Sequence, residues 1–367
     1  MIPKVIAFYL PQYHPTEHND EWWGEGFTEW TNVGKAKKLF PGHYQPKVPA
    51  NLGYYDLRVP EVREKQVQLA QEAGVYGFCY YHYWFSEGHE ELDFPFKDVV
   101  RRGKPDFPFC LCWANESWYS KFWNKDGSSS KKILAEQLYP GEKDNEAHFY
   151  SLLDAFKDKR YIKIDGKLLF MIYQPFSFVK FQEFKNQWNN LAKKNGLNGF
   201  YFVAQTLEAD KVGKVLDMGF DGVNHCFRLD LYYRLKSGSR LIWYLINFLK
   251  VFIHIPFVIS YKKVIKHCVK DIDYLENVFP TMMPNWDHTP RSGCGGSVLH
   301  NATPKLFKKH AKSILATTMS KKAEHSIVFL KSWNEWGEGN YMEPDIRYGK
   351  GYIKALNEAL IEIRNKK

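Results

Sequence analysis

Residues 326–333, Ser-Ile-Val-Phe-Leu-Lys-Ser-Trp, form a short apolar run that leads directly into Asn334-Glu335-Trp336-Gly337-Glu338-Gly339. An apolar run of this length, bounded by a polar, glycine-containing motif, is typical of a buried strand that opens into a loop. Seven similar runs precede it, at residues 5–10, 75–83, 107–113, 168–173, 200–205, 222–225 and 279–283. Eight buried strands separated by amphipathic stretches predict a single α/β domain, a (β/α)8 TIM barrel with long βα loops over residues 1–367.

Glycines support this alternation of helices and strands. Gly74, Gly196 and Gly219 each stand between a helical stretch and an apolar run, where a glycine commonly ends a helix. The seventh run is the weakest, because Pro280 is tolerated only near the start of a strand. A doubly wound sheet is the alternative fold, but no glycine-rich phosphate loop follows the first run.

Polar and aromatic side chains gather where the predicted strands end. A TIM barrel brings the carboxyl ends of its strands to one face, and barrel active sites lie on that face. Six of the eight predicted strands carry this bias, which favours a binding or catalytic site there. The candidate residues at these ends and in the long loops are Tyr13, His14, Trp22, Trp30, His82, Tyr83, Trp84, Trp113, Asn115, Glu116, Trp286, Asp287, Arg291, Asn334 and Trp336.

Glu335 and Glu338 are the candidate catalytic pair. They follow the last apolar run, and Gly337 and Gly339 give the loop the freedom to turn both carboxylates into one cavity. Chemistry at a glycosidic bond needs such a pair, one group to accept a proton and one to donate a proton to the leaving oxygen. The alternative is that the two glutamates cap the following helix.

Several motifs together resemble one known family. The chain is similar to WbsX-type glycosyltransferases, which are related to glycoside hydrolase family 99, and the resemblance spans residues 5–340 in order. It rests on residues 6–15 (IAFYLPQYHP), 22–33 (WWGEGFTEWTNV), 42–46 (GHYQP), 77–85 (GFCYYHYWF), 113–116 (WANE), 286–291 (WDHTPR) and 334–339 (NEWGEG).

The resemblance implies roles for the carboxylates. The related hydrolases are retaining endo-α-mannosidases, in which the first glutamate of the motif deprotonates the sugar's own 2-hydroxyl and the second protonates the leaving group. Carried over, Glu335 is the base and Glu338 the acid/base. One departure is Gly337, which stands where the hydrolases have a histidine.

The other candidates have both a binding and a structural interpretation. His14, His82 and Tyr83 are expected either to bind sugar hydroxyls or to be satisfied core groups. Asn115 and Glu116 are expected at the reaction centre, and Trp22, Trp23, Trp30 and Trp118 are expected either as stacking platforms or as packing. Asp287 and Arg291 either form a structural ion pair, or Arg291 meets a phosphate or an acidic sugar.

The composition limits the possible partners. The net charge of +10 comes from 51 Lys and Arg against 41 Asp and Glu, but these side chains are spread along the chain without a recognisable nucleic-acid module, so no nucleic acid is expected. Six cysteines without metal-ligand spacing indicate reduced thiols, and we expect neither a catalytic metal nor a cofactor. Residues 1–4 run straight into the first strand, which leaves no room for a signal peptide and favours a cytoplasmic protein.

An apolar insert interrupts the pattern between strands six and seven, within residues 229–272. Residues 241–259 are long and apolar enough for a membrane span, but a single crossing there would separate the last two strands from the rest of the barrel. Two interpretations remain. The insert packs against the protein or a second copy, or it dips into the membrane interface beside its basic flanks.

Three functions are compatible with these features. The first is a glycosyltransferase of cell-surface polysaccharide biosynthesis, such as O-antigen or capsule, acting on a saccharide donor and a lipid-linked glycan acceptor at the inner face of the membrane. The second is a retaining endo-acting glycoside hydrolase. The third is a non-catalytic glycan-binding protein.

Overall fold

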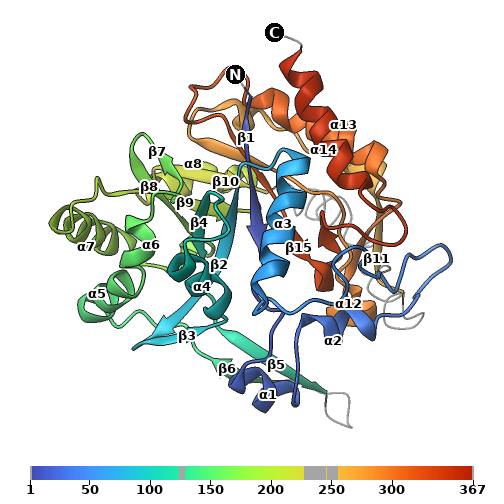
Figure 1. Cartoon of the computed structure of the whole chain (residues 1–367), viewed down its shortest axis with the longest axis horizontal. Helices are drawn as coiled ribbons and strands as arrows, with labels where there is room; N and C mark the ends of the chain where they lie inside the picture. Colours follow the sequence, from blue (N-terminus) through green and yellow to red (C-terminus); the bar gives the residue numbers. More distant parts are fainter. Residues whose placement is uncertain (1, 124–128, 227–244, 246–254, 366–367) are drawn as a thin grey trace.

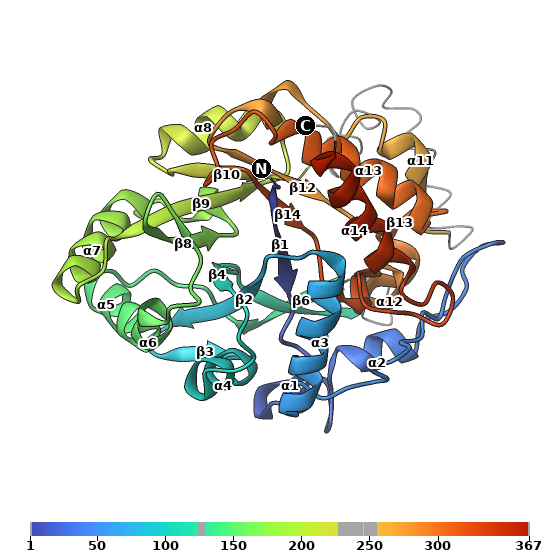
Figure 2. The ribbon, with the colours of Figure 1, turned by 45° about the horizontal axis from the view of Figure 1, so that its top comes forward.

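Eight parallel strands close into a barrel, as the apolar runs predicted. The computed structural model describes residues 2–123, 129–226, 245 and 255–365 of the chain (Figure 1). β1 is paired with both β14 and β2, and every other barrel strand lies between its neighbours in chain order, which closes the ring (Figure 2). The barrel strands are β1 (Lys4–Tyr9), β2 (Gly77–Ser86), β4 (Phe109–Trp113), β8 (Lys167–Ile172), β9 (Phe200–Thr206), β10 (Gly222–His225), β12 (Val278–Met282) and β14 (Ile327–Leu330).

Helices surround the barrel. Figure 2 shows α3, α13 and α14 together on one side of the ring and α5, α6 and α7 on another. The helices that follow barrel strands or join them are α3 (Pro60–Ala73), α4 (Phe94–Arg102), α5 (Glu142–Ser151), α6 (Leu153–Lys157), α7 (Phe181–Lys194), α8 (Val212–Asp217), α11 (Tyr261–Val264), α13 (Pro304–Thr317) and α14 (Gly351–Arg364).

Long loops at the carboxyl ends of the strands carry further short elements. The first βα loop holds α1 (Glu17–Trp23) and α2 (Glu29–Gly34), and α12 (Thr289–Ser292) follows β12. The third loop holds a hairpin, and the last holds the candidate catalytic motif. The short strands are β3 (His89–Glu91), β5 (Trp118–Trp123), β6 (Ser129–Ala135), β7 (Lys163–Ile164), β11 (Phe257–Ser260), β13 (Ser297–His300), β15 (Asn334–Glu335) and β16 (Asn340–Tyr341).

The glycine that ends α3 shows why the sequence turns there. Gly74 adopts φ 81°, a left-handed conformation that strongly favours glycine, and its N–H donates to the carbonyl of Ala70. A Cβ at this position would also lie 2.6 Å from Leu360 Cδ1 on α14. Gly196 and Gly219 likewise have positive φ after α7 and α8, so all three predicted helix stops are confirmed.

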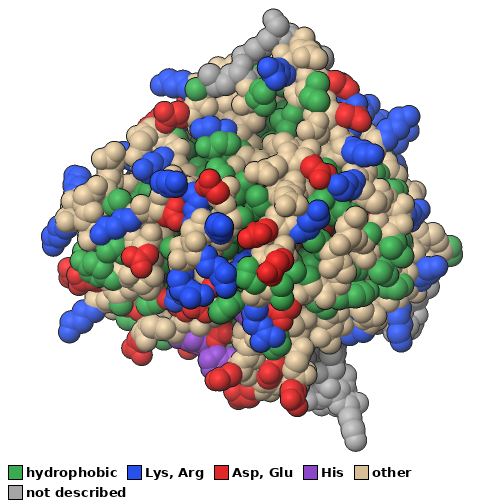
Figure 3. All heavy atoms as spheres, viewed as in Figure 1, with side chains coloured by type: hydrophobic (Ala, Val, Ile, Leu, Met, Phe, Trp, Pro, Cys, Tyr) green, Lys and Arg blue, Asp and Glu red, His purple; other side chains and the backbone are tan. Residues whose placement is uncertain are grey.

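Apolar rings fill the barrel. Phe8 on β1 stacks on Tyr81 of β2 and on Phe329 of β14, with ring centroids 5.4 and 5.3 Å apart. The seventh strand is confirmed, and Pro280 lies opposite His225 of β10 in its parallel ladder. Lys and Arg side chains are scattered among acidic ones over the face in Figure 3, as their spread along the chain predicted.

The insert between β10 and β12 lies largely outside the described residues. Its described end forms β11, which pairs in parallel with β13, so residues 257–259 belong to a small two-stranded sheet. Among the residues that the structure describes, no helix has the length and apolarity needed to cross a membrane. Whether residues 241–256 bind a membrane or pack internally stays a prediction.

Candidate active site

Asn334 anchors the last βα loop to the end of the first strand. Its side-chain Oδ1 accepts from the Leu10 N–H at 2.8 Å, and its Nδ2 donates to the Leu10 carbonyl at 2.9 Å. The Tyr13 hydroxyl donates to the Asn334 carbonyl and accepts from the Trp336 N–H. Asn334, Tyr13 and Trp336, all candidate sugar ligands from the sequence, therefore shape the loop that carries the two glutamates.

A buried carboxyl holds the Trp336 ring. Glu343 accepts from Trp336 Nε1 at 2.7 Å, from the Tyr55 hydroxyl at 2.9 Å and from Gln66 Nε2 at 2.7 Å. Burial raises the pKa of Glu343 to about 7, although these hydrogen bonds lower it. Trp30 lies with its ring centroid 5.6 Å from that of Trp336 and donates to the Tyr55 carbonyl, so Trp30 also belongs to this support.

Glu335 is buried at the base of the site. Its N–H donates to Ser332 Oγ at 3.1 Å, and its side-chain Oε2 has no hydrogen-bond partner among the described residues. Burial and the neighbouring Glu338 raise the pKa of Glu335 to about 7, while Lys331 and Arg291 lower it. A carboxyl with this pKa exchanges its proton near neutrality, as a general acid or base requires.

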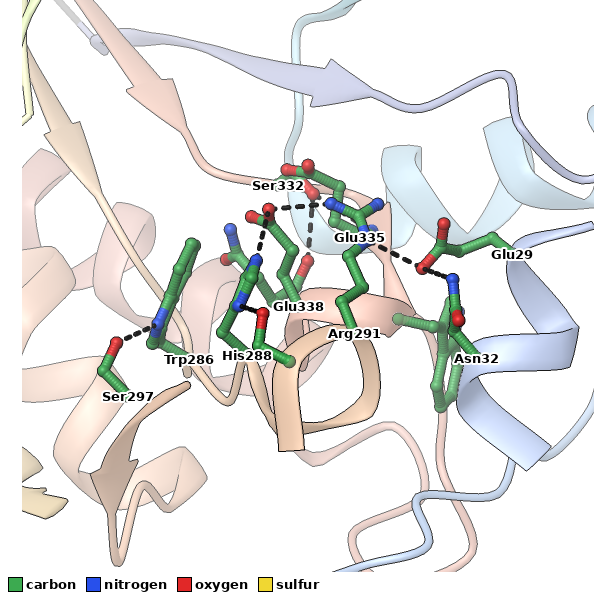
Figure 4. Close-up of polar contacts among 12 residues, drawn as sticks. Glu29, Asn32, Trp286, His288, Arg291, Ser297, Ser332, Glu335 and Glu338 are labelled. Carbon is green, nitrogen blue, oxygen red and sulfur yellow. Dashed lines mark hydrogen bonds and ion pairs between the residues drawn. The ribbon is translucent and has the colours of Figure 1, made fainter. Parts of the chain in front are cut away.

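Glu338 faces Arg291 of α12 (Figure 4). The guanidinium Nη1 donates to Glu338 Oε1 at 2.8 Å, and Nε donates to Glu29 Oε1 of α2 at 2.8 Å. His288 Nε2 lies 3.6 Å from the same Glu338 oxygen. Burial lowers the pKa of Arg291, but Glu29 and Glu338 outweigh it and raise that pKa above its usual value. The permanent cation therefore favours the ionised form of Glu338.

Gly337 leaves the space that Glu29 fills. A Cβ at position 337 would lie 1.5 Å from Glu29 Oε1 and 2.6 Å from Glu29 Cδ. The carboxylate of Glu29 thus lies where a side chain at 337 would begin. Glu29 was not predicted as a site residue, because nothing in its own loop indicates a partner 262 positions further along the chain.

The two glutamates open into a cavity of about 920 Å³. Of the predicted residues, the structure brings Tyr83, Asn115, Glu116 and Arg291 to this cavity together with Glu335 and Glu338. Trp23 and Trp118 also line it. Lining residues that the sequence did not indicate are Gln12, Asn19, Tyr81, Tyr139, Tyr173, Gln174 and Lys331.

Lys331 is the most informative of these additional residues. It is buried, and although burial lowers its pKa, Tyr173, Glu335 and Glu338 raise that pKa above its usual value. Lys331 follows directly after the last strand, and its amino group lies over the Tyr173 ring, 5.9 Å from the centroid. The site therefore holds two cations, Lys331 and Arg291, between its carboxylates.

Four of the predicted residues lie outside this cavity. His82 faces away from it, with Nε2 2.8 Å from His148 Nε2 of α5, and Trp84 stacks on the same His148 ring. Trp113 donates to the Trp84 carbonyl, and its ring also contacts His148. His14 is buried against the Pro11 carbonyl. These four residues do not line the cavity.

Asp287 and Arg291 do not form the ion pair that their spacing indicated. Asp287 pairs instead with His43 Nε2 at 2.8 Å and Gln45 Nε2 at 2.7 Å, and these partners lower the pKa of Asp287 to about 2 although burial raises it. Trp286 and Asp287 line a separate cavity of about 50 Å³. Proximity in sequence was misleading because the chain turns through α12 between the two side chains.

Trp22 lies beyond the cavity wall. Its ring stacks on His18 with centroids 5.4 Å apart and meets the edge of Trp118, which lines the cavity. The same region brings His18, His89 and Glu91 together, a grouping that their positions in the sequence did not indicate.

A paired-carboxylate site in an aromatic-lined cavity at the carboxyl ends of a (β/α)8 barrel is the architecture of a carbohydrate-active enzyme, and comparisons with known proteins agree. The family model of the glycosyltransferase WbsX matches residues 5–356, and the chain belongs to this family. The protein is therefore a glycan-processing enzyme.

Two curated relatives are proteins named uncharacterized protein WxcX from two strains of Xanthomonas campestris pv. campestris. Each is 30% identical to this chain, and the match covers 97% of the chain but 49% of the relative. The chain thus spans about half the length of the curated relatives it matches.

Solved structures share the fold. The GH99 endo-α-mannosidase from Bacteroides thetaiotaomicron in complex with bis-tris-propane aligns with a TM-score of 0.58 and 14% identity, over 98% of this chain and 97% of the other. A second structure of that mannosidase aligns with a TM-score of 0.56 and 15% identity over the same shares. A glycoside hydrolase-like protein aligns with a TM-score of 0.54 and 16% identity, over 98% and 94%.

Proposed function

We propose that the protein is a glycosyltransferase of cell-surface polysaccharide biosynthesis that forms a glycosidic bond with Glu335 and Glu338. The observation that carries this proposal is that both carboxyl groups open into one large cavity, in environments that differ. The WbsX family is described as a glycosyltransferase family, which favours transfer over hydrolysis.

The charges around the pair divide the roles of acid and base. Glu335 is buried, lacks a partner for Oε2 among the described residues and has a raised pKa, so it retains a proton near neutrality and donates it to the leaving oxygen. Glu338 is paired with Arg291 and stays ionised, so it accepts the proton of the attacking hydroxyl. One proton enters and one leaves the pair in each turnover, and exchange with water restores both groups. This division is the reverse of the one that the family resemblance implied.

The cavity wall suits a saccharide. Tyr83 and Trp118 offer ring faces to the apolar faces of a sugar, while Asn115, Glu116 and Gln174 offer hydrogen-bonding groups for hydroxyls. Asn115 is itself held in place, since its Nδ2 donates to the Tyr139 hydroxyl at 2.8 Å and to the Gln174 carbonyl at 3.0 Å. A cavity of about 920 Å³ has room for parts of both a donor and an acceptor.

The proposal includes a lipid-linked glycan acceptor at the cytoplasmic face of a membrane, without a cofactor. The basic flanks of the insert at residues 229–272 support it, since Lys and Arg are attracted to anionic headgroups. Co-sedimentation with anionic liposomes tests this part. We expect binding that deletion of residues 241–259 abolishes, and binding that survives the deletion contradicts the role of the insert.

The test of the main proposal is transfer of labelled sugar by the purified protein to lipid-linked acceptors, from a panel of candidate donors. We expect product with the wild type and at least about 100-fold less with Glu335→Gln and Glu338→Gln, because each removes one proton-transfer step. Glu64→Gln, an exposed change on α3, is the matched control and is expected to have full activity.

Hydrolysis is the alternative, favoured by the fold shared with the endo-α-mannosidase structures. Release of free sugar from an oligosaccharide without any acceptor, lost in the same two variants, would establish hydrolysis instead. Full biological activity of both variants would support a non-catalytic glycan-binding role.

A further inference from the structure

The loop elements beside the cavity bring three metal-ligating side chains together. His18 on α1 and His89 and Glu91 on β3 place His18 Nδ1, His89 Nε2 and Glu91 Oε1 within 4.8 Å of one another. Figure 1 shows α1 and β3 on the same side of the molecule, and hydrogen bonds link them, although 73 positions separate His18 from Glu91.

We propose that His18, His89 and Glu91 bind a divalent transition metal ion such as Zn²⁺. Two imidazole nitrogens and one carboxylate oxygen are the ligand types that this ion prefers, and three protein ligands leave a fourth position for water or another ligand.

The geometry converges on one carboxylate oxygen. Both histidines contact Glu91 Oε1, His89 Nε2 at 2.7 Å and His18 Nδ1 at a still shorter distance. The two imidazole rings lie with centroids 5.3 Å apart at an interplanar angle of 67°, so they approach the oxygen from different sides. Ligand atoms around a tetrahedral Zn²⁺ stand about 3.3 Å apart, which a small outward rotation of both rings provides.

The burial of the three side chains fits an open site. Glu91 is nearly fully buried with 3% of its side chain exposed, whereas 49% of His18 and 37% of His89 is exposed. The buried carboxylate forms a fixed floor, since Glu91 pairs with Tyr83 in the β2–β3 ladder. The two histidines can move to admit an ion from solvent without disturbing the core.

The ion would fix the rim of the sugar cavity. α1 carries His18 and, next to it, Asn19 and Trp23, which line the cavity. Trp22 on the same helix stacks on His18 and contacts Trp118 of the cavity wall. A metal that joins α1 to β3 therefore holds two of the cavity's lining residues in place, while Glu335 and Glu338 lie on a different loop.

The test is metal binding by the full chain after treatment with a chelator and dialysis. We expect one Zn²⁺ per chain by elemental analysis, a rise in the thermal unfolding midpoint on adding Zn²⁺, and partial quenching of tryptophan fluorescence by Co²⁺, because Trp22 stacks on a ligand. His18→Ala, His89→Ala and Glu91→Gln are expected to weaken Zn²⁺ binding by more than the about 10-fold that is lost when a residue supporting a metal ligand is removed.

His267→Ala is the matched control, since this histidine is exposed on a different part of the surface and is expected to leave Zn²⁺ binding unchanged. Circular dichroism of each variant verifies folding, and the two exposed histidine variants keep the test valid if Glu91→Gln fails to fold. Absence of stoichiometric Zn²⁺ in the wild type, or equal Zn²⁺ affinity in the wild type and the histidine variants, would overturn the proposal.

Discussion

Gly337→Ala tests the arrangement around the candidate catalytic pair with a single added methyl group. The new Cβ would lie 1.5 Å from Glu29 Oε1, 2.6 Å from Glu29 Cδ and 3.1 Å from Arg291 Nε. The backbone of Gly337 does not adopt positive φ, so alanine is tolerated there and the cost comes from the lack of space. The Glu29 carboxylate, of which 2% is exposed, has to move away from Arg291.

The magnitude follows from the loss of a buried ion pair. Removing one partner from such a pair leaves an uncompensated charge and costs about 3–5 kcal/mol. We expect the free energy of unfolding of Gly337→Ala, measured by urea denaturation, to fall by about 3 kcal/mol. Sugar transfer is expected to fall as well, because Arg291 no longer positions Glu338.

Gly213→Ala is the matched control. Gly213 lies in α8 with no atom within 4 Å of the position that the methyl group would take, and alanine in a helix is expected to be neutral or to stabilise by up to about 1 kcal/mol. In the Glu29→Ala background the space at 337 is free, so Gly337→Ala should add little further destabilisation. A loss of less than about 1 kcal/mol in the single variant, with unchanged transfer, would refute the reasoning.

Three further predictions concern stability. The folded protein retains a proton on Glu335 between pH 4.5 and about 7, so its stability falls as the pH rises through this range, by up to about 3 kcal/mol; urea denaturation at pH 5 and 8 should show this fall reduced in Glu335→Gln, and equal falls would contradict it. Asn334→Ala removes both hydrogen bonds to Leu10 and should lower the free energy of unfolding by about 2–4 kcal/mol, whereas an unchanged urea midpoint would contradict the anchoring role. The pKa of Asp287 is lowered from 3.8 to about 2 beside His43, so this carboxylate contributes about 2 kcal/mol above pH 4 that is lost as the pH falls toward 2; Asp287→Asn should lack this acid-dependent loss, and identical acid denaturation of both proteins would contradict it.

The fold was predictable because each barrel strand is buried on both sides. Such strands are nearly continuous apolar runs, and eight of them returned in the order of the chain. The pair Glu335 and Glu338 was predictable as well, since both belong to one loop motif that follows the last strand directly.

The orientation of side chains at the strand ends was not predictable from residue type alone. Successive residues on a strand point to opposite sides, so Tyr81 and Tyr83 of β2 reach the cavity while His82 and Trp84 point toward α5. The polar and aromatic bias at the strand ends identified the correct face of the barrel but did not separate these two sets.

Contacts between distant loops were also beyond the sequence. Glu29 meets Arg291 across 262 positions, and His18 meets Glu91 across 73. Neither pair belongs to one motif, and only the closed barrel brings their loops together. Lys331 was overlooked because it stands in an apolar run, where a lysine is usually a boundary residue, whereas here it is buried between carboxylates.

The Glu29–Arg291 pair changes the meaning of Gly337. The family resemblance implies a histidine at this position in the related hydrolases, and its absence suggested a lost function. The structure instead fills that volume with the Glu29 carboxylate, which holds Arg291 against Glu338. An imidazole can lose its charge near neutrality, but a guanidinium stays charged at any pH at which the protein folds. Glu338 therefore faces a permanent cation, and the pH dependence of the reaction near neutrality should come from Glu335.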